Sequence, residues 1–405
     1  MIEDSAGVAA RVAEARKLRG WSQQRLAAET RGAGTPVSLG LIQSVEQGKR
    51  AATPAFVAAC AKALRITAAE LLGQPYMPST AEDREVHAAI ALLRTEMAAW
   101  DMEDPDIAVR PIATLSRDVL AARKLRRDAS SPKLAAVLPS LMTETRTLMY
   151  RSVGNDREQV GALLAELYYN ARSMAHKLGY PDLAAIAVDR MTWAANESGD
   201  NLWIAAAQFH RASLLTSGGD WKTAMTYLER CRTEFENRLG VGDESDLIAW
   251  GGLHLQSGLA AARGGRRDLV DMHLIEATET ADRLRSGDSD EILVFGPTNV
   301  GIWGVALAVE SLDSATAIRR ADKLYIPTET PRSRSGHHYI DLARAYQLQG
   351  SRDRVMGSLM TARALAPSMV RFHPMVHETV RMMAREDARR TDSVRGFAAW
   401  CGIAL

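Results

Sequence analysis

Four segments of the chain share one residue spacing, and this repeat constrains the fold more than any other feature. In each segment a glycine is followed by apolar or small residues five, nine and twelve positions later, a spacing that forms one face of a helix. The glycines are Gly179, Gly219, Gly265 and Gly350. Their intervals of 40, 46 and 85 residues leave room for one further helix pair near residues 312–324. This period predicts a solenoid of stacked helix pairs.

The composition favours helices in the rest of the chain as well. Hydrophobic residues make up 46% of the 405 positions, and Ala, Leu and Arg, which lead the helix-propensity scale, are abundant. Alternating runs of β-branched residues, which would indicate strands, are nearly absent. The sequence has no run of 18 apolar residues and no apolar leader, so we expect a cytoplasmic protein that does not enter a membrane. We therefore predict an all-α fold.

Turn and capping residues divide residues 1–73 into five short helices. Ser22, Ser38, Thr53 and Thr67 occupy positions expected of N-caps, and Gly48 ends the third helix. Residues expected to lie on the core face of the first helix are Val8, Val12, Ala15 and Leu18.

A change in composition at residues 73–80, GQPYMPST, marks a boundary, because Gly and Pro interrupt the periodic segments there. We therefore predict an N-terminal domain at 1–73, a linker at 74–81 and a second, helical domain at 82–405. Lys and Arg exceed Asp and Glu by four in residues 1–73, whereas the remainder has a net charge of −3. A basic N-terminal domain followed by a slightly acidic second domain predicts that nucleic-acid contact is confined to the N-terminal domain.

The motif of the N-terminal domain reads Leu18-x-x-Trp21-Ser22-Gln23-x-x-Leu26-Ala27, then Ser38-x-x-x-Ile42-x-x-Val45-Glu46-x-Gly48-Lys49, then Pro54 and the closing ALRITAAELL. It resembles the XRE/Cro-type helix-turn-helix family. Because the longer domain has a period near the ~34 residues of tetratricopeptide (TPR) units, we expect a TPR-like solenoid. The combination resembles regulators of the Rgg/PlcR type and the helix-turn-helix–TPR regulators of actinomycetes.

The resemblance implies a transcriptional regulator that binds double-stranded DNA at an inverted-repeat operator as a homodimer. In this family the second helix of the motif lies in the major groove with its N-terminal residues at base edges. Carried over to this sequence, the groove-facing residues are Ser38, Leu39, Gly40, Gln43 and Ser44. Gln43 suits adenine, and Leu39 suits a thymine methyl group. Phosphate contacts are assigned to Gln23, Arg25, Lys49 and Arg50.

One departure from the family is the link ETRGAGTPVS, which is a few residues longer than the usual tight turn. Its additional residues, 32–34, either loop toward the DNA backbone or bulge into solvent.

The solenoid is expected to bind a signalling peptide or a small molecule on its inner surface, which the first helix of each pair makes. Inner or adjacent positions that suit such a ligand are Tyr169, Asn170, Ser173, Phe209, His210, Asn299, His337 and Arg344. The alternative is that these residues pack against the next helix or face water.

Signals for catalysis are poor. The histidines of HPMVH, His373 and His377, have the spacing of one helix face, but no third metal ligand completes a site. We expect no enzymatic activity, no catalytic residue, no metal and no cofactor. The alternative to a regulator is a scaffold that binds a partner protein, with the helix-turn-helix in a minor role. The two differ at the basic face around Gln23, Ser38 and Lys49, which a scaffold does not need.

Overall fold

The computed structural model describes residues 7–76, 80–236, 239, 244–285, 287, 292–386 and 392–404. Within these residues every regular element is an α-helix, so the predicted all-α fold is confirmed. No helix of the described part is long and apolar enough to cross a membrane.

The N-terminal unit contains the five expected helices. They are α1 (Val8–Leu18), α2 (Gln23–Gly32), α3 (Leu39–Glu46), α4 (Pro54–Leu64) and α5 (Ala68–Leu72). The predicted caps are confirmed, because the side chains of Ser22, Ser38, Thr53 and Thr67 each accept a hydrogen bond from a backbone N–H in the first turn. One expectation is wrong: Leu18 is 78% exposed, because α1 ends there and the side chain lies beyond the core made by Val8 and Val12.

The remaining helices form pairs. They are α6 (Ala81–Ala98), α7 (Ile112–Arg127), α8 (Ser131–Arg151), α9 (Gly154–Leu178), α10 (Pro181–Ser198), α11 (Asn201–Ser217), α12 (Trp221–Glu236), α13 (Glu244–Arg263), α14 (Arg267–Asp282), α15 (Pro297–Glu310), α16 (Ser314–Ala321), α17 (Arg332–Leu348), α18 (Arg352–Leu365), α19 (Pro367–Arg371), α20 (Pro374–Glu386) and α21 (Asp392–Cys401). The extra pair expected near residues 312–324 is α15 and α16.

The repeated spacing has the structural meaning expected from the sequence. All four turn glycines have positive φ, between 72° and 85°, where a side chain would be strained. Of the twelve residues that follow them at the repeated spacing, eleven are buried and Leu274 is partly buried. Each glycine therefore turns the chain from the first helix of a pair into the buried face of the second.

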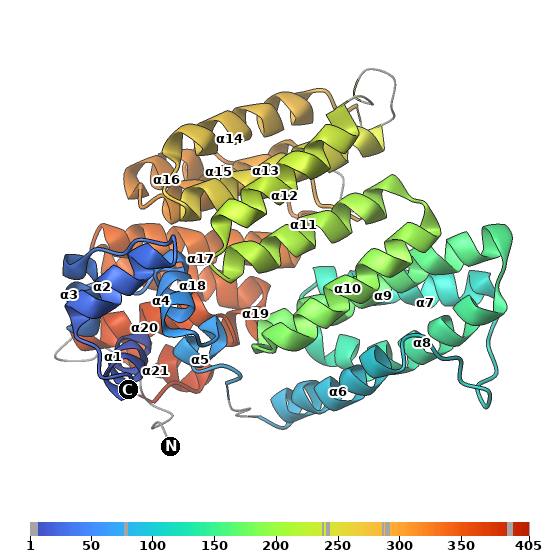
Figure 1. The fold of residues 1–405 in the computed structure, drawn as a ribbon, viewed down its shortest axis with the longest axis horizontal. Helices are drawn as coiled ribbons and strands as arrows, with labels where there is room; N and C mark the ends of the chain where they lie inside the picture. Colours follow the sequence, from blue (N-terminus) through green and yellow to red (C-terminus); the bar gives the residue numbers. More distant parts are fainter. Residues whose placement is uncertain are drawn as a thin grey trace.

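The helix pairs form an arc that closes on itself (Figure 1). The first helices of successive pairs, α11, α13, α15 and α17, contact one another in order, and their partners pack against them. At the far end α17 also contacts α7. Ala129, at the turn after α7, is buried in the same cluster as Ile340 of α17. The inner helices of distant repeats therefore face a shared interior.

The N-terminal unit is docked on the solenoid rather than held by the linker alone. Its helices lie beside α17–α21, on the side of the molecule away from α6–α8 (Figure 1). The backbone N–H of Ala52 donates to Glu378 Oε1 on α20 at 3.1 Å. Lys62 Nζ on α4 donates to the carbonyl of Gly219, between α11 and α12, at 3.4 Å.

The predicted linker contributes to this contact. The ring of Tyr76 stacks on the ring of His377 on α20, with centroids 3.9 Å apart. Residues 77–79 of the predicted linker lie outside the described residues. The boundary at residue 73 thus falls at the end of α5, but the residues just after it pack on the second domain.

Candidate DNA-binding surface and the inner surface of the solenoid

Helix α3 presents one face to the core and the other to solvent. Ile42 and Val45 are fully buried, whereas Ser38 and Gly40 are exposed and Gln43 is half-buried. The Ser38 hydroxyl accepts a hydrogen bond from the backbone N–H of Leu41 at 3.2 Å, which keeps its own proton available to a ligand. Ser38, Gly40, Gln43 and the half-buried Ser44 therefore lie on the accessible side of this capped helix, whereas Leu39 is half-buried and packs against the core.

Glu46 joins the first three helices. Its carboxylate accepts two hydrogen bonds from Arg16, both at 2.9 Å, and one from Gln23 Nε2 at 2.7 Å. Arg16 also donates to the carbonyl of Trp21 at 2.6 Å. Burial raises the pKa of Glu46, but the hydrogen bonds from Arg16 and Gln23 outweigh it and lower the pKa overall. This ionised carboxylate sets the angle between α1, α2 and α3.

The same contact bears on Gln23, which the sequence assigns to a phosphate. One N–H of its side-chain amide is donated to Glu46, so a phosphate contact in this conformation uses the second N–H of that amide or the backbone N–H groups at the start of α2. Arg25 forms an exposed ion pair with Glu29 at 2.5 Å. Lys49 and Arg50, just beyond α3, are exposed, and no ion pair of the described residues includes them. They are the strongest candidates for phosphate contact.

The longer link after α2 begins with two further helical residues, and Gly32 and Gly34 are exposed to solvent. Helix α2 continues to Gly32 with Ala33 as its C-cap, and Gly34 follows with φ of 77°. Thr35 and Val37 are buried, and the Val37 N–H donates to the Thr30 hydroxyl at 3.1 Å. Two residues of the link, Arg31 and Gly32, thus extend the helix, and the buried Thr35 and Val37 hold the rest of the link against the core.

A comparison with protein families agrees with this geometry. Residues 12–71 match the family model described as helix-turn-helix. The N-terminal unit is thus a helix-turn-helix DNA-binding domain of the XRE/Cro type expected from the sequence. The match ends before the solenoid, and a search of curated proteins finds no match for the chain.

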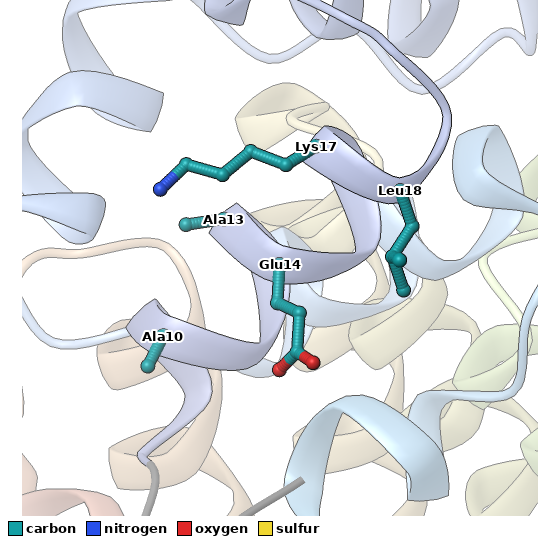
Figure 2. Close-up of a pocket in the computed structure, with 5 residues that line it drawn as sticks. All are labelled: Ala10, Ala13, Glu14, Lys17 and Leu18. Carbon is teal, nitrogen blue, oxygen red and sulfur yellow. The ribbon is translucent and has the colours of Figure 1, made fainter. Parts of the chain in front are cut away.

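A shallow hollow lies on the outer side of this domain, over α1. Ala10, Ala13, Glu14, Lys17 and Leu18 line it. Figure 2 shows that the Lys17 and Glu14 side chains point away from each other. Because no polar groups converge there, the hollow has no feature of a ligand site.

The expected ligand residues fall into two groups. The first group contains residues of α9, α11 and α17 whose side chains lie near one another or near the same inner surface. The Tyr169 and His210 rings lie 4.5 Å apart between centroids, and Phe209 meets His210 edge-on at 5.2 Å. Asn170 lies one residue from Tyr169 and is fully buried, and Ser173 lies one turn further along α9. His337 of α17 lies 5.5 Å from His373, between ring centroids.

The second group is bonded to protein. The Asn299 amide donates to the Val294 carbonyl at 2.5 Å. Arg344 forms ion pairs with Glu310 and Asp341, each at 2.9 Å. The pair between Arg344 and Glu310 joins α17 to α15, and the bond from Asn299 fixes the segment before α15.

Four cations at the inner surface were missed by the sequence reasoning. Arg126 lies in the last turn of α7, Arg172 and Lys177 lie on α9, and Arg334 lies in the first turn of α17. Arg172 follows Tyr169 by three positions and could have been found from helix periodicity. Arg126 and Arg334 could not, because only the closure of α17 onto α7 brings them to the same place.

The surroundings of these cations perturb their protonation. Burial lowers the pKa of Lys177 to about 8, and the positive charges of Arg126, Arg334 and Arg172 add to the effect. Burial and the neighbouring Arg334 and Arg126 lower the pKa of Arg172 to about 10. Burial and, after it, the positive charge of Arg172 lower the pKa of His176 to about 3.

Proposed function

We propose that the chain is a sequence-specific, DNA-binding transcriptional regulator and not an enzyme. The observation that carries this proposal is the accessible face of α3, where Ser38, Gly40 and Gln43 follow a capped N-terminus. Uncharged side chains on this face suit base reading, because Gln can make paired hydrogen bonds to adenine. The cations Lys49 and Arg50 stand at the end of the helix, where they suit phosphate contact.

We further propose that the protein acts as a homodimer on an inverted-repeat operator. A single helix-turn-helix unit makes too few base contacts for useful specificity, and paired units read half-sites about 34 Å apart. The TPR-like solenoid would hold the two units at that spacing. Sedimentation of the free protein and footprinting of its complex test this: one protected segment with one protein per DNA would reject the dimer.

The solenoid is also proposed to sense a peptide or small-molecule signal. Support comes from the elements that hold the DNA-binding domain. Helix α11 carries His210 on the inner surface, and the turn at its end contacts Lys62. His373 lies directly before α20, which carries the Glu378 that binds Ala52. A ligand that shifts α11 or α20 would alter the docking of the DNA-binding domain, and such coupling must be reciprocal.

The test of base reading is a mobility-shift titration with DNA from upstream of the protein's own gene and with sites selected from random sequence. Binding should weaken steeply with salt, because phosphate contacts release counterions. The Gln43→Ala variant should lose discrimination at one base position by about 1–3 kcal/mol. Gln47→Ala, at the exposed end of the same helix, is the matched control and should keep it. Equal weakening on every sequence would show that Gln43 does not read a base.

A further inference from the structure

The inner surface of the solenoid gathers positive charge from helices that are far apart in the sequence. Arg126 of α7 lies over the Tyr169 ring, 4.0 Å from its centroid, and donates to Asn170 Oδ1 at 2.7 Å. Arg172, one turn along α9, donates to the Ser213 hydroxyl of α11 at 3.3 Å. Lys177 lines one recess together with Arg126. Besides burial, the charges of Arg126 and Arg334 lower the pKa of Lys177 and of Arg172, and Arg126 lowers the pKa of Arg334, so Arg334 also lies near this group.

Negative charge does not balance this cluster, which we call the inner cationic cluster (Arg126, Arg172, Lys177 and Arg334). Glu166 is its nearest carboxylate, bonded to Arg126 at 3.2 Å and shared with Arg123 at 2.6 Å. Within the described residues no acidic side chain forms an ion pair with Arg172, Lys177 or Arg334. Uncompensated charge of this kind is costly inside a protein, and proteins retain such strained groups at functional sites.

Polar atoms of the cluster's neighbours are also left without partners. His210 is only 4% exposed, and neither of its buried ring nitrogens has a hydrogen-bond partner among the described residues. The Asn170 Nδ2 and the Arg172 Nε are likewise buried and unbonded. Buried donors normally find partners, so these atoms point to a group that completes them. A recess of about 10 Å³, the space of one water molecule, is lined in part by Arg126, Ser173 and Lys177.

We propose that the inner cationic cluster binds a small molecule carrying a diphosphate or a comparable pair of anionic groups. This inference rests on the proposed signal-sensing role of the solenoid and specifies the chemistry of its ligand. Four cations and one shared carboxylate match a ligand of several negative charges better than a single carboxylate. Arg side chains bind phosphate oxygens in pairs, while Lys177 adds a point charge and His210 and Asn170 add neutral hydrogen bonds.

The experiment uses the full chain and inorganic pyrophosphate as the probe, with isothermal titration calorimetry and thermal unfolding. Pyrophosphate should bind and raise the Tm, and its affinity should fall with salt. Arg334→Gln and Lys177→Gln should each weaken binding by roughly tenfold or more. Arg332→Gln, an exposed arginine on the same helix, is the matched control and should bind as the wild type does. Citrate, in a parallel titration, separates carboxylate from phosphate preference.

A purely structural role for these cations predicts a different pattern. If the cluster exists for a ligand, removing one charge relieves repulsion, and ligand-free Arg334→Gln should unfold at a Tm equal to or above that of the wild type. Absence of pyrophosphate binding by calorimetry, or equal loss in Arg332→Gln, would overturn the proposal. A lower Tm for Arg334→Gln with undiminished pyrophosphate binding would do so as well.

The same samples separate this inference from the proposed function. Mobility shifts with and without pyrophosphate test whether the site influences DNA binding. If pyrophosphate binds through Arg334 and DNA is not bound at all, the site stands and the regulator is rejected. If DNA binds specifically and pyrophosphate does not bind, the regulator stands and the inner site is rejected.

Discussion

The buried ion pair between Arg16 and Glu46 allows a quantitative test of what holds the DNA-binding domain together. Replacing Glu46 with Ala removes three hydrogen bonds, two from Arg16 and one from Gln23. It also leaves the Arg16 guanidinium without its counter-ion at a site where only 10% of the Arg16 side chain and 7% of the Glu46 side chain are exposed. The perturbation is local, because all three partners lie on α1–α3.

The expected magnitude follows from this burial. Removing one partner of a buried pair costs about 3–5 kcal/mol, mostly because the other charge remains in a poorly solvated place. Arg16 keeps some exposure and its bond to the Trp21 carbonyl, so we expect the lower end, about 3 kcal/mol. The pair between Arg25 and Glu29 offers a matched control, because its side chains are 62% and 33% exposed. Glu29→Ala should cost less than about 0.5 kcal/mol.

Hydrogen exchange of the full chain, followed by mass spectrometry, is the appropriate assay because it reports the opening of α3 separately from that of the solenoid. Glu46→Ala should lower the protection of α3 amides by roughly 150-fold, and Glu29→Ala by about twofold at most. Amides of α13 should be unchanged in both variants. A loss below about threefold in Glu46→Ala, or equal losses in the two variants, would refute the argument from burial.

Two further predictions concern the docking of the domains and the response to pH. In Gly219→Ala the new methyl carbon would lie 3.1 Å from the Ala58 carbonyl oxygen, at a residue whose φ is 76°. We therefore expect the free energy of unfolding to fall by about 1–3 kcal/mol and proteolysis near Tyr76 to become faster. Gly350→Ala, at a turn where the methyl group would meet no neighbouring atom, should show only the cost of the strained backbone and no faster cleavage near Tyr76. Burial lowers the pKa of His254 to about 3, so the unfolded chain binds this proton first and stability is lost as the pH falls from about 6.5 toward 3. His254→Gln should therefore reduce the stability lost between pH 7.5 and pH 5, measured by denaturant unfolding, by about 2 kcal/mol, and an unchanged loss would contradict the low pKa.

The helices of the DNA-binding domain could be predicted because their signals are local. Ser38 caps α3 and Gly48 ends it, and each signal acts on the backbone of the adjacent helical turn. Leu18 shows the limit of such reasoning, since its place in the periodicity suggests burial but the end of α1 exposes it. The extension of α2 to Gly32 was also hidden, because the glycines of RGAG predicted a loop more strongly than a helix.

The sequence by itself determined the all-α fold, the capped helices of the helix-turn-helix unit and the helix pairs, because periodicity and capping depend on neighbours within about one or two turns. Only the tertiary structure decided how the pairs close into a ring. It thereby brought Arg126, Arg172 and Arg334 to one interior surface, and it placed Glu378 against Ala52. Such contacts join residues up to 326 positions apart. No local spacing encodes them, since they depend on the summed angles of many helix pairs along the solenoid.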